Sequence, residues 1–259
     1  LIVNDEIIRQ EDPVLITDGS GGAIISWIDF RNDLAGDIYV NRIIDGEDGD
    51  GELAWGESGI LLCDDCSNGS ENMSKTQCID GNNGAWIAWA DRRGSNWDLY
   101  ISHVDAEGNI DPVFEDNGLP VVVEVGDQRT VTMEHDGAGG AFIAWLDKRD
   151  AANDDIYIEH VLANGTMVNG SNGQPVVTVA GAQQSPKITW DGGTGCYVAW
   201  VDKRNDNAGD IYVQHYASDL TPSLADDGVA IAETVNNEEK NPRLSYAGDG
   251  ATLLMWEDN

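Results

Sequence analysis

A tryptophan recurs along this chain at a nearly constant spacing. It closes an apolar run and is followed within two residues by an acidic side chain at Trp27, Trp89, Trp145, Trp200 and Trp256. The period is about 56 residues, and a long period built from short strand-like runs is typical of propellers and solenoids. The fold class is therefore constrained before any single residue is considered.

Each repeat contains four candidate strands. Around Trp145 they cover residues 132–135, 141–145, 156–160 and 174–178. The first two are joined at Asp136-Gly137, and Asp-Gly between apolar runs is a strong hairpin signal. The second strand is apolar on both faces, so both of its faces must be covered. These features predict an all-β protein, a β-propeller of four-stranded antiparallel blades.

We expect a single propeller domain over residues 1–259. Its repeats cover about 11–74, 75–130, 131–184 and 185–239, with a partial repeat at 240–259 and residues 1–10 as the last strand of a preceding blade. The partial repeat supplies two strands, which leaves an open edge, and open edges pair with other strands. The ring is thus expected to be completed either by a longer polypeptide or by a neighbouring subunit.

The charge of the chain excludes several classes of partner. Its formal net charge is −33, from 47 acidic and 14 basic residues. Such a charge repels phosphate backbones, so we expect no nucleic-acid binding. No apolar run reaches the roughly 20 residues needed to cross a membrane, so membrane insertion is not expected. An acidic, well-solvated surface favours a secreted protein.

Three of the four cysteines lie close together in sequence. Cys63 and Cys66 form a C-x-x-C motif, and Cys78 follows. The missing His after Cys66 excludes covalent haem attachment, and no second C-x-x-C completes a zinc site. We expect a local disulfide among these three. Cys196 occupies a position held by Ala in other repeats and is expected to be a small buried hydrophobe.

An Asp-x-Arg motif ends each second strand, and a further Asp opens the third strand. We expect the Arg to bind a carboxylate through its planar guanidinium and to clamp the loop between the two strands. Because the motif is repeated in every unit, a structural role is predicted and no catalytic residue is assigned. The clamp residues are Asp29, Arg31, Asp37, Asp91, Arg93, Asp98, Asp147, Arg149, Asp155, Asp202, Arg204 and Asp210.

An acidic loop is found in the first repeat alone. Its carboxylates alternate with glycines and are Asp45, Glu47, Asp48, Asp50 and Glu52. Because Ca²⁺ takes six to eight oxygen ligands, this loop is a candidate Ca²⁺ site, with a solvated loop as the alternative. The sequence requires no other cofactor.

Three histidines fall at one position of successive repeats. His103, His160 and His215 stand where Arg42 stands in the first repeat. Packed sheets lie about 10 Å apart, so these side chains cannot share one metal ion, and we interpret them as part of the repeat structure. His135 alone lies on a first strand and could face the central channel.

The repeat resembles the TolB-type propeller repeat. Segments of the form I-A-W-x-D-x-R, followed by D-I-Y-V and preceded by a D-G-x-G-G turn, are similar to a variant found in arrays in secreted or surface-attached bacterial proteins. The resemblance covers residues 13–258 and departs at the longer loops of the first repeat and at the truncated fifth. It implies a propeller that serves as an interaction platform, in an extracellular or bacterial cell-surface location.

We therefore expect a non-enzymatic extracellular module, a surface scaffold or adhesion platform that binds protein or glycan. One alternative is a subunit of a surface filament that assembles by strand donation at the open blade edge. The other is a glycan-processing enzyme, which needs two carboxylates about 5 to 10 Å apart. Glu134 and Glu11 are the carboxylates near the first strands, and they do not form a convincing pair.

Overall fold

The computed structural model describes residues 8–32, 34–46, 49–64, 66, 74–114, 117–150, 153–233 and 238–259. Apart from one short 3-10 helix, η1 (Pro112–Phe114), every regular element of this part is a β-strand. No helix in it is long and apolar enough to cross a membrane. The predicted all-β propeller architecture is confirmed. Most of the strand expected at residues 1–10 lies outside the described residues.

Five antiparallel sheets follow one another, numbered here as blades one to five. Blade one contains β1 (Gln10–Thr17), β2 (Ala23–Asp29), β3 (Asp37–Ile44), the short β4 (Glu52–Leu53) and β5 (Ile60–Cys63). Blade two contains β6 (Lys75–Ile79), β7 (Ala85–Asp91), β8 (Asp98–Val104) and β9 (Leu119–Val122). Blade three contains β10 (Gln128–His135), β11 (Ala141–Asp147), β12 (Asp155–Val161) and β13 (Gln174–Val177). Blade four contains β14 (Gln183–Trp190), β15 (Cys196–Asp202), β16 (Asp210–Tyr216) and β17 (Val229–Ala232), and blade five contains β18 (Glu239–Gly248) and β19 (Ala251–Asp258).

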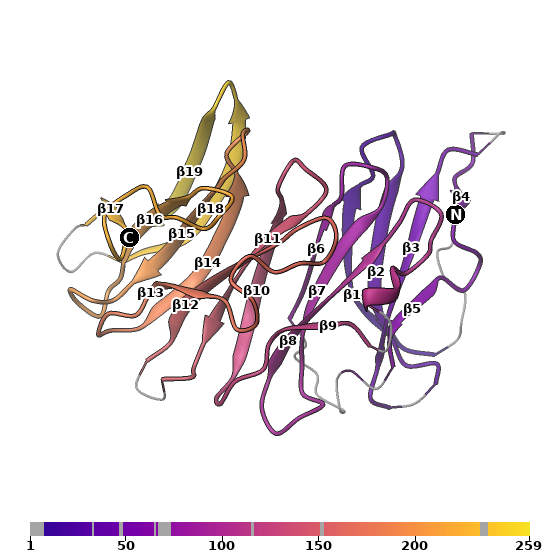
Figure 1. Cartoon of the computed structure of the whole chain (residues 1–259), viewed down its shortest axis with the longest axis horizontal. Helices are drawn as coiled ribbons and strands as arrows, with labels where there is room; N and C mark the ends of the chain where they lie inside the picture. The colour runs from indigo at the N-terminus through magenta and orange to yellow at the C-terminus, as the bar shows by residue number, and fades with distance from the viewer. Residues whose placement is uncertain are drawn as a thin grey trace.

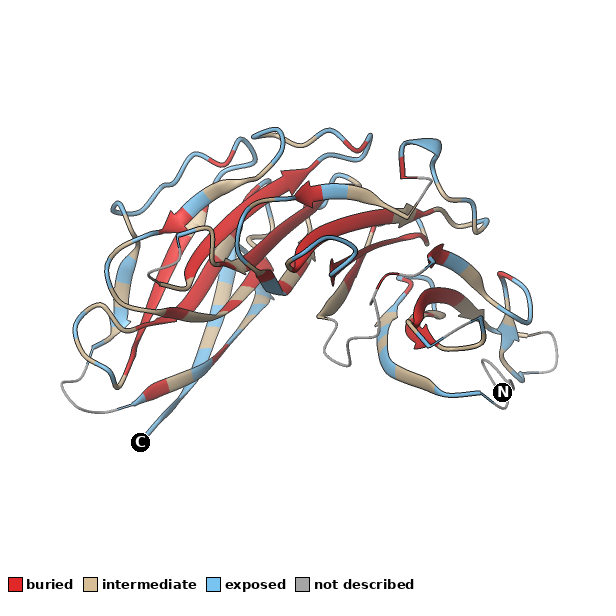
Figure 2. Cartoon of the chain, turned by 90° about the horizontal axis from the view of Figure 1, so that it is seen from below, coloured by how far each residue is buried: buried red, intermediate tan, exposed pale blue. Residues whose placement is uncertain are grey.

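The blades are arranged along an arc. Figure 1 shows them side by side in chain order, with the N-terminal and C-terminal blades at opposite ends. Figure 2 shows the same succession from below, curving between the two ends. The first strands of neighbouring blades contact one another, from β1 through β6, β10 and β14 to β18. These five strands therefore form the inner side of the arc, and we call them the innermost strands.

The hydrophobic core lies between the blades. Trp86 of blade two packs with Met133 of blade three, and Phe142 of blade three packs with Ile188 of blade four. Between such bulky residues the second strands carry alanine, for example Ala88, which is fully buried. Close-packed sheets require large side chains to interdigitate with small ones, which explains why the second strands are apolar on both faces.

Each of four innermost strands contains a β-bulge near its start. The register shifts between residues 11 and 14, 129 and 132, 184 and 187, and 240 and 243. At each shift one residue adopts a positive φ, which is uncommon outside glycine. These bulge residues are Asp12 (47°), Thr130 (56°), Ser185 (55°) and Asn241 (52°). The bulges bring four polar side chains to the same end of the innermost strands, and Asp12 alone among them is acidic.

Candidate functional site at the innermost strands

The repeated Asp-x-Arg motif forms a closed unit at the rim of each blade. In blade one Asp29 accepts hydrogen bonds from Trp27 Nε1 at 2.9 Å and from Arg31 Nη2 at 2.6 Å. The Arg31 guanidinium lies 4.0 Å from the ring centroid of Tyr39 and donates to the carbonyl of Ser58. The corresponding ion pairs are Arg93–Asp91, Arg149–Asp147 and Arg204–Asp202. Their carboxylates are buried and engaged within the protein.

The aspartate that opens each third strand pairs in register with the clamp aspartate, as Asp37 does with Asp29. It is bonded differently: Asp37 accepts from Asn32 Nδ2 at 2.7 Å. In blade two burial and the neighbouring Asp91 raise the pKa of Asp98 to about 6. In blade three burial and the nearby aspartates raise the pKa of Asp155 to about 6 as well. Asp210 holds the same place in blade four.

The histidines at the repeated position each bind their own blade's turn. His103, His160 and His215 place Nε2 at 3.0, 2.9 and 2.9 Å from Oδ2 of the turn aspartates Asp80, Asp136 and Asp191. In blade one Arg42 binds Asp18 at 2.7 Å in the same way. Each of these side chains therefore binds the turn of its own blade, and His160 and Arg42 also bond a carbonyl of the next blade, those of Ser218 and Ala106.

The acidic loop of blade one carries exposed carboxylates at Asp45, Asp50 and Glu52. Glu47 and Asp48 lie outside the described residues. In the part of this loop that the structure describes, no three carboxylates come within 4.8 Å of one another. Calcium binding there stays a prediction.

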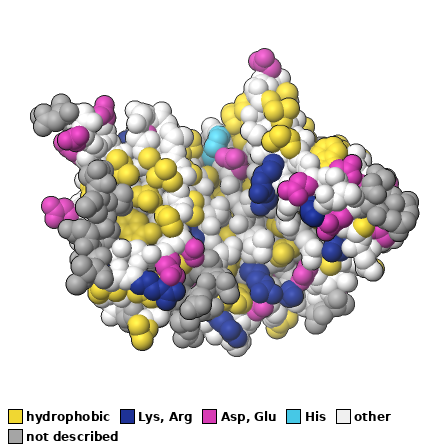
Figure 3. Space-filling model, turned by 180° about the vertical axis from the view of Figure 1, so that it is seen from behind, with side chains coloured by type: hydrophobic (Ala, Val, Ile, Leu, Met, Phe, Trp, Pro, Cys, Tyr) yellow, Lys and Arg dark blue, Asp and Glu magenta, His cyan; other side chains and the backbone are white. Residues whose placement is uncertain are grey.

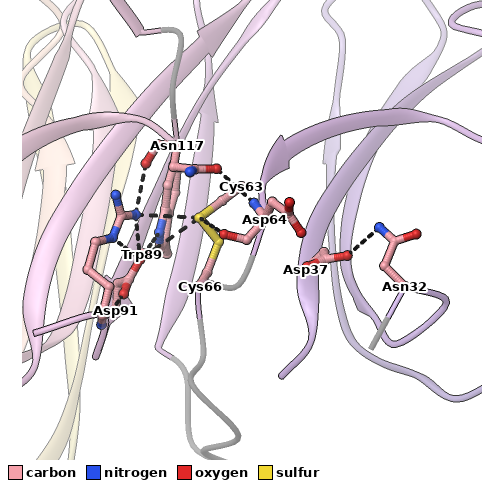
Figure 4. The surroundings of a disulfide bond; sticks show 9 residues. Asn32, Asp37, Cys63, Asp64, Cys66, Trp89, Asp91 and Asn117 are labelled. Carbon is pink, nitrogen blue, oxygen red and sulfur yellow. Dashed lines mark hydrogen bonds and ion pairs between the residues drawn. A yellow bond between two sulfur atoms is a disulfide. The ribbon is translucent and has the colours of Figure 1, made fainter. Parts of the chain in front are cut away.

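Cys63 and Cys66 are joined by a disulfide, with their Cα atoms 5.8 Å apart. As Figure 4 shows, Cys63 lies against the clamp of blade two, with its sulfur 3.4 Å from Arg93 Nη2 and 3.9 Å from Asp91 Oδ2. Cys78 and Cys196 are buried free thiols, and burial raises the pKa of both. The sulfur pair and Asp91 are close enough to hold a metal ion. The disulfide and the Arg93–Asp91 ion pair already occupy these groups.

A half-buried lysine, which sequence reasoning missed, holds the bulge of blade one. Lys75 Nζ donates to the carbonyl of Asp12 at 3.1 Å, to the carbonyl of Ser26 at 3.2 Å and to Ser26 Oγ at 3.0 Å. Burial lowers the pKa of Lys75 to about 8. A signal was present: the repeat has proline at this position in three other blades, at Pro13, Pro186 and Pro242. The lysine links blades one and two beside the exposed carboxylate of Asp12.

The two carboxylates considered in the sequence do not meet. Glu11 is bonded to Arg9 on the surface, near the bulge of β1. Glu134 lies near the other end of β10, where burial raises its pKa. Their positions along the blade follow from their partners on the second strand. Glu11 pairs with Ile28. Glu134 pairs with Phe142, which holds the position of Ile24 in blade one. Four residue steps separate these levels, roughly 13 Å along the strand, so the two cannot flank one bond.

The innermost strands thus carry polar groups at both ends. At the bulge end lie Asp12 and Lys75, and at the turn end lie Glu134 and His135. Figure 3 shows a face hollowed between the two ends of the arc, where a histidine, acidic side chains and basic side chains gather. This hollow is the region in which a ligand could contact several blades at once.

Comparison with known proteins supports the fold. No family model matches the chain, and no curated protein matches it. It is similar to a Penicillium chrysogenum α-L-arabinanase complexed with arabinobiose, with a TM-score of 0.52, 9% identity and coverage of 96% of this chain and 80% of that one. It is also similar to a protein of unknown function from Dyadobacter fermentans, with a TM-score of 0.51, 12% identity and coverage of 98% and 76%.

A third match is to a Hadza microbial sialidase, Hz136, with a TM-score of 0.49 and 15% identity over 85% of this chain. The chain spans 47% of the length of that sialidase. At these identities the matches show the fold.

These matches correct four expectations. The assignment to the TolB-type repeat is wrong, because the match of known activity with a TM-score above 0.5 is an α-L-arabinanase. The same finding overturns the interpretation as a non-enzymatic scaffold, and it favours the glycan-processing alternative. Binding of a protein partner and self-assembly through the open edge find no support, whereas a glycan partner is consistent with the matches. The TolB-like motif gave a wrong assignment because its residues form the rim clamp, which stabilises the packing within one blade.

Proposed function

We propose that this chain is a glycan-processing propeller of the glycoside hydrolase type, with its reaction centre at the bulge end of the innermost strands. The observation that carries the proposal is the presentation of Asp12. Its bulge has a positive φ, its side chain is exposed, and Lys75 from the next blade bonds its carbonyl at 3.1 Å. Carboxylates fixed on rigid strands are what glycoside hydrolysis requires.

The second carboxylate of such a centre would come from the loops that enter the innermost strands at the same end. Glu124 and Asp127 lie between β9 and β10, and Glu233 follows β17. Glu124 and Glu233 each accept a hydrogen bond from an asparagine, Asn172 and Asn205 respectively. These bonds hold each carboxylate through its Oε1 atom.

The charge of the chain favours a neutral glycan as substrate. A net charge of −33 repels glycans rich in uronic or sialic acids and leaves neutral polysaccharides unaffected. Location outside the cell, which suits a polysaccharide substrate, and calcium at the acidic loop of blade one are further parts of the proposal.

The test is turnover of neutral polysaccharides, starting with arabinan, by the wild-type chain and by Asp12→Asn. Asparagine occupies the equivalent bulge at Asn241 with a φ of 52°, so the variant is expected to fold. We expect a loss of turnover of about 10³-fold or more, as for removal of a group that acts in the transition state. Glu11→Gln is the matched control, since Glu11 is a neighbouring carboxylate bonded to Arg9. Full turnover by Asp12→Asn, or no turnover of any neutral glycan by the wild type, would overturn the proposal.

A further inference from the structure

A row of aromatic side chains crosses three blades at the turn end of the innermost strands. The residue that precedes the turn aspartate is His135 in blade three, Trp190 in blade four and Tyr246 in the corresponding place of blade five. The ring centroids of His135 and Trp190 are 5.0 Å apart, and those of Trp190 and Tyr246 are 5.1 Å apart. Blades one and two carry Thr17 and Ile79 at this position, so the row is no property of the repeat.

Two rings of the row, Trp190 and Tyr246, each lie on the turn of the preceding blade. A Cβ added at Gly137 would meet the Trp190 indole at 2.9 Å, and one added at Gly192 would run into the Tyr246 ring. Both glycines have a positive φ, 75° and 84°. The Trp190 and Tyr246 rings are therefore held against bare backbone. All three rings of the row, His135 included, remain partly exposed. The result is a row of three partly exposed rings in contact with one another, built from three separate strands.

Polar groups border this surface. Glu134 Oε1 accepts the backbone N–H of His135 at 3.2 Å and lies 3.7 Å from His135 Nε2. No other hydrogen-bond partner of the Glu134 side chain is found in the described part of the chain. Trp190 Nε1 donates to the carbonyl of Gly193 at 3.0 Å, so the polar edge of the indole is satisfied within the turn. What the row offers a ligand is therefore ring surface, the His135 imidazole among it, flanked by the Glu134 carboxylate.

We infer that the row His135–Trp190–Tyr246, with Glu134 at its edge, is a binding surface for a neutral saccharide. Aromatic rings pack against the C–H faces of a sugar, while a carboxylate and an imidazole hydrogen-bond its hydroxyl groups. The choice of a neutral glycan as ligand rests on the function proposed above. The charge of −33 disfavours an anionic one.

This surface is distinct from the reaction centre at the bulges. Along β14 the bulge lies at Ser185 and the ring at Trp190, which are five residues or roughly 16 Å apart. The surface would hold a second stretch of the same polysaccharide, away from the bond that is cleaved. Its contribution is attachment of the protein to the polymer.

Binding, measured without any reliance on turnover, tests this inference. Isothermal titration of the whole chain with linear arabinan, and with polygalacturonate as the anionic comparison, gives affinities for the wild type and for Trp190→Ala. We expect the variant to bind arabinan about tenfold more weakly, a difference of about 1.4 kcal/mol, and polygalacturonate to bind neither protein. Trp256→Ala is the matched control, since Trp256 is a partly exposed tryptophan on β19, outside the row.

A second variant guards against a general loss of folding. Trp190→His reproduces the ring of blade three and is expected to retain more affinity than Trp190→Ala. Equal affinity of the Trp190→Ala and Trp256→Ala variants for arabinan would overturn the inference. If the wild type binds arabinan through Trp190 but hydrolyses no glycan, the proposed function is overturned and the binding surface is retained. The two failures can therefore be told apart.

Discussion

Lys75 on the innermost strand of blade two donates a hydrogen bond to the carbonyl of Asp12, on the innermost strand of blade one. The same ammonium group bonds both oxygens of Ser26. One half-buried cation thus joins two blades at the bulge that presents the exposed Asp12 carboxylate. Testable consequences concern this contact and the repeated units around it.

Removing the Lys75 charge should change how stability depends on pH. Burial lowers the pKa of Lys75 to about 8, from 10.5. Between these values the unfolded chain binds a proton that the folded chain does not, so the free energy of unfolding rises with pH. We expect Lys75→Met to flatten this rise, as measured by urea unfolding from about pH 7 to about pH 10. An unchanged slope would show that Lys75 titrates normally.

His160→Phe should destabilise the turn of blade three. His160 is buried, bonds Asp136 through Nε2 and the carbonyl of Ser218 through Nδ1, and stacks on Phe142. Phenylalanine keeps the stack and loses both bonds, for an expected cost of about 1–3 kcal/mol in chemical unfolding. His215→Phe is the matched control. Because the His215 side chain is 23% exposed against 2% for His160, its loss should be smaller.

The same turn predicts a loss of stability in acid. Burial disfavours the charged form of Asp136, but hydrogen bonds from His160 and two backbone N–H groups outweigh it and hold its pKa below 3.8. The stabilisation is present above pH 3.8 and is lost as the pH falls through the folded-state pKa. Thermal melts below about pH 4 should therefore converge for the wild type and Asp136→Asn. A stability difference between them that persists in acid would contradict this account.

Arg149→Lys should weaken the clamp although it keeps the charge. Arg149 bonds Asp147 through two nitrogens, lies 3.9 Å from the ring centroid of Tyr157 and donates to the carbonyl of Asn172. Lysine cannot reproduce the planar fork, so we expect a loss of about 1–3 kcal/mol in urea unfolding. Lys148→Met is the control, because its ion pair with Asp154 is more exposed. Equal effects of both changes would contradict a specific role for the fork.

Gly173→Ala should cost more than Gly170→Ala. Both glycines have a positive φ, 60° and 75°, so both variants carry backbone strain. A Cβ at Gly173 would also run into the Trp145 ring, whereas one at Gly170 meets open space. The difference in melting temperature between the two variants therefore isolates the clash with the tryptophan. We expect Gly173→Ala to melt at the lower temperature.

The sequence predicted the strands well because their signals are local. The Asp136-Gly137 turn forms because Gly137 can adopt a positive φ, which depends on that residue alone. The apolar second strand around Trp145 requires only that other sheets cover both of its faces. The period of the repeats then specifies several such sheets in succession. The acidic loop and the cysteines could be named as candidates, since both are compositional signals.

Local sequence patterns predicted neither the structural relatives of the chain nor its candidate site. The motif around Arg149 repeats because every blade needs a rim clamp, and it says nothing about the inner side of the arc. Asp12 looks like an ordinary residue before a proline until the bulge gives it a positive φ, and Lys75 acquires its role by reaching into another blade. Neither contact is encoded by spacing along the chain.

The sequence by itself determined an acidic chain of repeated four-stranded sheets, because strand periodicity, turn chemistry and the Asp-x-Arg motif act within one blade. Only the tertiary structure decided which side chains meet on the inner side. Bringing Lys75 to Asp12, and Trp190 to His135 and Tyr246, depends on how successive blades pack along the arc. That packing joins residues more than 50 positions apart in the chain, and so it sets the chemistry at both ends of the innermost strands.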